Sequence, residues 1–223
     1  MNWVLTHAPA LVLGIPALAA ALLAVLPGYR VTARINVAAT GLTLLASSAL
    51  LGHRPEPGHF LLVDDLNVVF ILLNSFVGFT TSWFSASYIG HEIESGRLPR
   101  PYLRFYHAMY QVLMFGMNLA LLANNIGLMW VAIEVATLTT VMMVGIYRTP
   151  EALEAAWKYF ILGSVGIALA LFGTILVYMA AQPVVGEGLD AMIWTVLLER
   201  AAGFDPALLN VAFAFLLLGY GTK

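Results

Sequence analysis

Residues 124–148, NNIGLMWVAIEVATLTTVMMVGIYR, decide the fold of this chain. Between Asn125 and Arg148 the sequence is an unbroken apolar stretch with a single ionisable residue, Glu134, close to its middle. A membrane-spanning helix needs ~20 mostly apolar residues, so this stretch is long enough to cross a bilayer. A charge at the hydrocarbon centre costs at least ~2.5 kcal/mol, so we expect this carboxylate to have a partner or a function.

The composition predicts an all-α polytopic membrane protein. Of the 223 residues, 61% are hydrophobic and only 10% are charged, whereas about 25% are charged in soluble proteins. Cysteine is absent, which excludes disulfides and cysteine-ligated zinc or iron–sulfur clusters from this chain. The five histidines are scattered, with none at the i, i+4 spacing of a helical metal site, so we expect neither a metal nor another cofactor here.

About seven membrane spans are predicted from apolar stretches of sufficient length. They cover residues 8–26, 32–51, 66–89, 103–123, 126–147, 156–181 and a seventh that runs from Pro206 to Lys223. No Lys or Arg precedes the first span, so we expect a retained helix and not a signal peptide. The last span is still apolar at Lys223. We therefore expect residues 1–223 to be a single transmembrane domain at the front of a longer chain.

The loops between these spans carry unequal positive charge. The odd-numbered loops and their edges hold seven Lys and Arg residues, and the even-numbered loops hold two. The first set is Arg30, Arg34, Arg97, Arg100, Arg104, Arg148 and Lys158, and the second is Arg54 and Arg200. The positive-inside rule then predicts cytoplasmic odd loops and an N-terminus outside, in a bacterial-type inner membrane. Residues 182–205 are expected to form an external loop with an interfacial helix, because LDAMIWTVLLER joins Trp194 to a polar end.

Three residues could form a buried charge relay, and each has a plainer alternative. Glu134 shares a helix face with Thr137 at i+3. It could be a protonatable site of a relay, or a neutral Glu that is hydrogen-bonded to a neighbouring helix and serves only packing. We favour the relay, because intramembrane acids mark functional sites. Lys158 follows Glu154 at the favoured i, i+4 spacing, so an interfacial anchor is a slightly better interpretation of Lys158 than a relay residue. Lys223 follows Gly219 and Gly221, and becomes intramembrane only if the chain continues.

Weaker candidates lie on the fourth, fifth and sixth spans. His107 and Asn118 are candidate relay or channel-lining residues, as is Thr137, although packing roles are favoured for the first two. Gly163, Gly166 and Gly173 are interpreted as positions where another helix packs closely.

Four segments resemble the antiporter-like subunits of complex I and the Mrp antiporters. They are LNVVFILLNSFVGFTTSWFSASYIGHE, MWVAIEVATLTT, LEAAWKYFILGSVGIALALFGT and LLLGYGTK. Within that superfamily they look most like component F of hydrogenase-4-type complexes, relatives of formate hydrogenlyase membrane subunits. The likeness runs from about residue 60 to the end, whereas residues 1–59 match only in hydropathy.

The resemblance implies a fold of about fourteen helices built from two inverted repeats, of which this chain is the N-terminal half with a broken seventh helix. It also implies that Glu134, Lys158 and Lys223 form the proton pathway of one half-channel. The chain would then be a non-catalytic, proton-translocating subunit of a hydrogenase-4 or formate-hydrogenlyase-type complex. Hydrogenase and iron–sulfur subunits would be its partners and would hold the redox centres.

Two alternatives stay open. The chain could belong to an Mrp-type cation/proton antiporter or a complex I-type enzyme, which would use the same residues without a hydrogenase. It could also be a scaffold subunit in which the buried charges only join helices.

Overall fold

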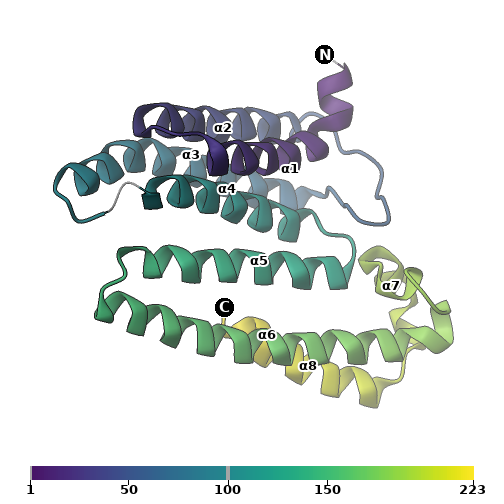
Figure 1. Ribbon diagram of the computed structural model, residues 1–223. Helices are drawn as coiled ribbons and strands as arrows, with labels where there is room; N and C mark the ends of the chain where they lie inside the picture. The colour runs from purple at the N-terminus through teal and green to yellow at the C-terminus, as the bar shows by residue number, and fades with distance from the viewer. Residues whose placement is uncertain (1, 99–100) are drawn as a thin grey trace.

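The computed structural model describes residues 2–98 and 101–223, and the side chains of residues 7–98 and 105–223. Arg100, counted in the charge argument, lies outside the described residues. Within these described residues the fold consists of seven long α-helices, one short α-helix and three 3₁₀ turns (Figure 1). The α-helices are α1 Asn2–Val25, α2 Tyr29–Ala49, α3 Asp65–Glu94, α4 Pro101–Leu122, α5 Ile126–Val144, α6 Pro150–Val185, the short α7 Trp194–Arg200, and α8 Pro206–Gly221.

Local sequence explains where the helices begin. Asp64 and Asn67 form a capping box at the start of α3, each side chain accepting a hydrogen bond from the other residue's backbone N–H. Asn125 accepts hydrogen bonds from two backbone N–H groups at the start of α5. Thr149 and Asp205 cap α6 and α8 in the same way, and each is followed by a proline at the first helical position.

Long helices occupy all seven ranges in which spans are predicted. Four segments are both long and apolar enough to cross a membrane, among the residues described: His7–Val25, Asp65–Glu94, Ile126–Tyr147 and Pro150–Val185. The apolar helix Pro206–Gly221 is shorter. For the remaining helices, membrane crossing stays a prediction. In α2 the buried residues include Thr32, Asn36 and Thr40, which lowers its hydropathy while keeping the polar groups between helices.

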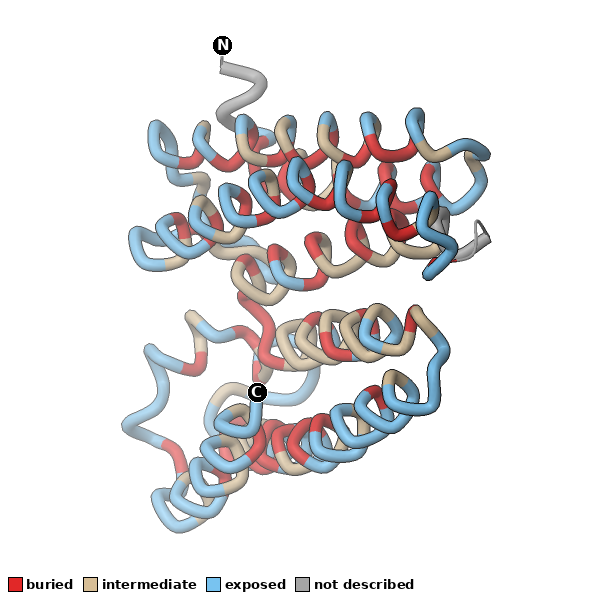
Figure 2. The backbone as a smooth tube through the Cα atoms, turned by 90° about the vertical axis from the view of Figure 1, so that its left-hand side faces the viewer, coloured by how far each residue is buried: buried red, intermediate tan, exposed pale blue. Residues whose placement is uncertain are grey.

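Several polar side chains are buried inside the helix group together with its apolar core, and many large apolar side chains face outward. Asn36, Gln111 and Asn118 are fully buried, whereas Leu18 and Leu162 are 75% and 71% exposed. Figure 2 shows buried residues on the inward faces of the helices and exposed residues on the outward faces. In a lipid bilayer, apolar side chains are favourable on the outward faces, and polar side chains on the inward faces join neighbouring helices by hydrogen bonds.

The odd-numbered loops meet at one end of the helix group. Ile89, Leu98 and Ile146 form a buried cluster there, with Tyr29 and Tyr147 packed against it. The opposite end is held by Asn124, whose backbone N–H donates to Phe60 and whose carbonyl oxygen accepts from Trp194. Isolated β-bridges join Leu61 to Ala123 and Asn125 to Ile193. Among the described side chains, Arg30, Arg97 and Arg148 are sequence neighbours of this cluster and lie at the same end, and the orientation of this end in the membrane stays a prediction.

The region between α6 and α8 differs in detail from the prediction. Helix α6 continues to Val185 through Pro183, beyond the predicted end of the span at residue 181. The helix expected within residues 182–205 is α7, only seven residues long, preceded by a 3₁₀ turn at Asp190–Met192. Its placement at the outer membrane interface stays a prediction.

Candidate functional site

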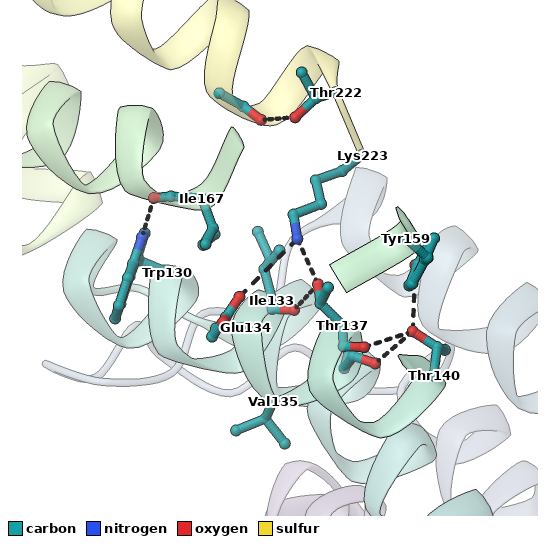
Figure 3. Close-up of polar contacts among 12 residues, drawn as sticks. Trp130, Ile133, Glu134, Val135, Thr137, Thr140, Tyr159, Ile167, Thr222 and Lys223 are labelled. Carbon is teal, nitrogen blue, oxygen red and sulfur yellow. Dashed lines mark hydrogen bonds and ion pairs between the residues drawn. The ribbon is translucent and has the colours of Figure 1, made fainter. Parts of the chain in front are cut away.

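One face of α5 carries the polar residues of the candidate site. Trp130, Glu134 and Thr137 follow one another at i, i+4 and i+7, so they lie on the same side of the helix. The Trp130 indole N–H donates to the carbonyl oxygen of Ile167 on α6 at 2.9 Å. Thr140, one turn further, donates to the Tyr159 hydroxyl of α6 at 3.2 Å. These two contacts hold α5 against α6 on either side of Glu134 (Figure 3).

Close packing of α8 on α6 determines where Lys223 lies. A Cβ added to Gly219 would be 2.4 Å from the backbone nitrogen of Ala170, and one added to Gly166 would be 1.8 Å from the Thr222 hydroxyl. A Cβ on Gly173 would likewise approach the Leu216 side chain to 2.8 Å. The prediction that Gly166 and Gly173 are close-packing positions is confirmed. The end of α8 lies part-way along α6, and in the view of Figure 1 the C-terminal residue is drawn between α5 and α6.

Lys223 reaches from the end of α8 to α5. Its ammonium donates a hydrogen bond to the Thr137 hydroxyl at 2.7 Å and lies 4.0 Å from the Glu134 carboxylate oxygen Oε2. Thr137 in turn donates to the carbonyl oxygen of Ile133 at 2.8 Å. The contact lies directly against Gly163, where an added Cβ would be 3.1 Å from the Thr137 methyl group and 3.4 Å from the Lys223 ammonium.

Both charges of this pair are largely enclosed. Lys223 is exposed through its backbone, but its side chain is only 18% exposed, and that of Glu134 is 21% exposed. Oε2 of Glu134 is buried and accepts no hydrogen bond from any described residue. The ion pair is therefore long. Moving the ammonium by ~1 Å would convert it into a charge-assisted hydrogen bond of ~2.8 Å.

Lys158 lies outside this arrangement. Its ammonium is paired with Glu154, one turn earlier on α6, and the two side chains are 71% and 65% exposed. This is the i, i+4 pair that the sequence offered as the alternative interpretation. The structure therefore brings together Glu134, Thr137 and Lys223, and leaves Lys158 on the outer surface of the helix group.

His107 is also separate from the charged pair. It is fully buried in α4, and neither ring nitrogen has a hydrogen-bond partner among the described residues. One turn away, Gln111 donates to the Asn36 side-chain oxygen at 2.9 Å. Asn118 accepts from Asn74 of α3 at 2.8 Å.

The pairing of Asn36 with Gln111 was missed from sequence. The available signal was the polar stripe of α2, in which Thr32, Asn36 and Thr40 recur every four residues. Among the described residues, no three His, Cys, Asp or Glu side chains form a group that could hold a metal ion.

The chain is similar in sequence and in fold to several known proteins. A sequence model of the family described as NADH:quinone oxidoreductase/Mrp antiporter, transmembrane, matches residues 123–223. A hydrogenase-4 component F homolog of Methylacidiphilum infernorum is 61% identical over 202 residues, which are 91% of this chain and 42% of that protein. The chain is therefore similar to antiporter-like membrane subunits of complex I and Mrp type, through the family model in residues 123–223 and through this relative over most of its length.

Further similar proteins were found by sequence and by fold. NADH-quinone oxidoreductase subunit N 1 of Opitutus terrae is 35% identical over 130 residues, covering 52% of this chain and 25% of that protein. A chain of respiratory complex I from Thermus thermophilus matches with a TM-score of 0.71 and 25% identity, covering 96% of this chain and 43% of the other. The archaeal membrane-bound sulfane sulfur reductase shares the fold, with a TM-score of 0.77, 21% identity, and coverage of 95% and 43%.

The comparisons also correct the extent of the predicted resemblance. Residues 60–223 number 164, so an alignment over 202 residues must include much of the segment that was expected to match only in hydropathy. The chain spans about two fifths of the length of this relative and of the two solved chains.

Proposed function

We propose that this chain is a proton-translocating membrane subunit of a hydrogenase-4 or formate-hydrogenlyase-type respiratory complex. The contact of Lys223 with Thr137 and Glu134, whose charged side chains are largely enclosed, carries the proposal. A lysine and a glutamate at membrane depth are costly, and such pairs mark ion and proton pathways. The 61% identity to a hydrogenase-4 component F homolog supports the choice of complex.

The proposed mechanism uses the length of the ion pair. While Lys223 is hydrogen-bonded to Thr137, its ammonium has the Glu134 carboxylate as counter-charge at 4.0 Å. Approach of the ammonium to Glu134 strengthens the pair, and separation leaves a charge in a medium of low dielectric, which favours release of the proton. An electrostatic change in a neighbouring subunit would drive this movement. Lys158 is paired with Glu154 at the exposed surface and would join the pathway only by leaving that partner.

The proposal extends to the fold, the membrane location and the partners of the full-length protein. The chain would form the N-terminal half, of about seven spans, in a fold of fourteen helices with two inverted repeats and a broken seventh helix. Coverage of 42% and 43% of the matched proteins supports this division. We place the chain in the bacterial-type inner membrane with its N-terminus outside. Hydrogenase and iron–sulfur subunits would hold the redox centres, and this chain would hold no cofactor.

The test is Glu134→Gln in the full-length protein within its complex. Proton uptake into proteoliposomes should fall at least tenfold, because the amide cannot exchange a charge with Lys223. Glu199→Gln, at an exposed acid of α7, is the matched control and should keep normal uptake. Full proton pumping by the Glu134→Gln complex would overturn the relay.

Measurements on the same proteoliposomes distinguish two other functions from the proposed one. The family description also names Mrp antiporters, which favours a cation/proton antiporter as the second candidate. Dependence of proton movement on sodium, without a hydrogenase in the complex, would favour that candidate. A scaffold role predicts that charge-neutral variants assemble and that proton movement is unchanged.

A further inference from the structure

A cavity of about 490 Å³ lies between α2 and α3, near the end where the odd-numbered loops meet. Its wall on α2 includes Arg30, Arg34, Val37 and Ala38, and its wall on α3 includes Trp83 and Ser87. The spacing of these residues places each set on one face of its helix. The cavity is therefore formed by two facing helix surfaces and lies apart from the Glu134–Lys223 pair.

The wall on α2 changes from basic to apolar along the helix. Arg30 and Arg34 occupy its first two turns, and Ala38 lies one turn deeper. The surface continues with Leu42 and Leu45, which are 54% and 67% exposed. On α3, Trp83 is 66% exposed at the cavity. A ligand that fits this surface has an anionic group at one end and an apolar chain at the other.

The charge of the two arginines is unbalanced within the described part of the chain. Arg54 and Arg97 are paired with Asp65 and Glu92, but no ion pair of a described residue involves Arg30 or Arg34. No carboxylate lines the cavity. Glu94 is close enough to Tyr29 to interact with it electrostatically. The cavity wall itself carries two positive charges.

The two helices are fixed against each other on both sides of the cavity. A Cβ on Gly90 would lie 2.6 Å from the Tyr29 hydroxyl, so the start of α2 is pressed against the end of α3. Further along, a Cβ on Gly41 would lie 3.3 Å from the Phe79 ring. These contacts keep Arg30 and Arg34 on a preformed surface.

We propose that this cavity binds one anionic phospholipid of the cytoplasmic leaflet. Guanidinium groups bind phosphate through charge-assisted, often bidentate hydrogen bonds, and Arg30 and Arg34 are one helical turn apart. Ser87 supplies a hydroxyl donor at the same level, and an acyl chain would cover Trp83, Ala38 and Leu42. A water-soluble anion would leave this apolar surface uncovered, so a lipid fits better. Basic surfaces near the cytoplasmic ends of membrane helices attract anionic lipids.

This proposal rests on the predicted orientation and is independent of the proton relay. The experiment uses the complete complex, delipidated in detergent and titrated with phosphatidylglycerol while native mass spectrometry counts retained lipid. The variants are Arg34→Gln, Arg30→Gln/Arg34→Gln and the charge-conserving Arg30→Lys/Arg34→Lys. Arg200→Gln, at the opposite end of the helix group, is the control. Proton uptake is measured in parallel.

At about 1 kcal/mol for each arginine, phosphatidylglycerol affinity should fall about fivefold in Arg34→Gln and about 25-fold in the double glutamine variant. The double lysine variant should lose less than threefold, the control should lose nothing, and proton uptake should be normal in all of them. Phosphatidylcholine should bind at least tenfold more weakly than phosphatidylglycerol.

Three results would overturn the lipid assignment. One is unchanged phosphatidylglycerol affinity in the double glutamine variant. Another is displacement of the lipid by inorganic phosphate at equal concentration, which would indicate a site for a free anion. The third is cross-linking of Trp83 to a neighbouring subunit with no lipid retained, which would show that a protein covers the cavity.

Discussion

Helices α1–α4 and helices α5, α6 and α8 hold buried polar groups by different means. In the first group, neutral pairs join the buried faces of the helices: Gln111 with Asn36 at 2.9 Å, and Thr40 with Ser82 at 2.6 Å. Its buried acid, Glu92, lies near the end of α3 and pairs with Arg97 of the following loop at 2.9 Å. In the second group Lys223 lies 4.0 Å from Glu134 and donates a hydrogen bond to Thr137 of the same helix, α5. The first arrangement is short and directional, whereas the second is long and charged.

This difference separates structural polarity from functional polarity. A neutral hydrogen bond between membrane helices contributes about 0.6 kcal/mol and changes little when the helices are fixed. The energy of a charged pair in low dielectric changes steeply with distance, so a small displacement alters the proton affinity of both groups. The α1–α4 group is therefore suited to a rigid support, and the α5–α6–α8 group to a movable charge.

The largest effect is expected from Gly219→Ala, which changes the packing that positions Lys223. The added Cβ would lie 2.4 Å from the Ala170 backbone nitrogen, so α8 must move away from α6. We expect the free energy of unfolding to fall by ~1–3 kcal/mol, as is typical of overpacking. The Tm of the complex and its proton uptake should therefore both fall. Gly14→Ala is the control, because its Cβ would meet nothing within 4 Å and alanine favours a helix by ~1 kcal/mol. Equal Tm values for the two variants would contradict the close contact.

The second effect tests the contrast between the two helix groups directly. Thr137→Val keeps the side-chain shape but removes the oxygen that accepts from Lys223 at 2.7 Å. We expect proton uptake to fall about tenfold, the effect of ~1.4 kcal/mol on a rate, and Thr137→Ser to restore most of it. Gln111→Leu, which removes a neutral pair from α4, should lower stability while uptake per assembled complex stays within about twofold. An equal loss of uptake in Thr137→Val and Gln111→Leu would remove the distinction.

The sequence predicts which residues of each helix belong to this site better than it predicts the contacts between the helices. Glu134 and Thr137 share a helix face by spacing alone, and the glycines of α6 fit close packing before any partner is known. The contact of Lys223 could not be predicted from spacing. It depends on α8 packing against α6 and ending opposite Gly163. Periodicity shows which face of one helix is polar, but not which helix meets it.

The same limit explains the pair that was missed. Asn36 and Gln111 each belong to a polar stripe visible on its own helix, yet they are 75 residues apart in sequence. The two stripes face each other only because α2 and α4 pack in one group. Family resemblance supplies such long-range information, and it groups Lys158 with Glu134, whereas the structure groups Lys158 with Glu154.

The smallest effect is expected from Lys158→Gln, which tests that disagreement. Its exposed pair with Glu154 is worth about 0.3–0.5 kcal/mol, so the Tm should hardly change. If Lys158 remains on the outer surface during turnover, proton uptake by the Lys158→Gln complex should stay within about twofold. Glu154→Gln is the matched control, because it removes the same pair and keeps the lysine. A loss as large as that of Glu134→Gln, absent from Glu154→Gln, would show that Lys158 leaves its surface partner and joins the relay.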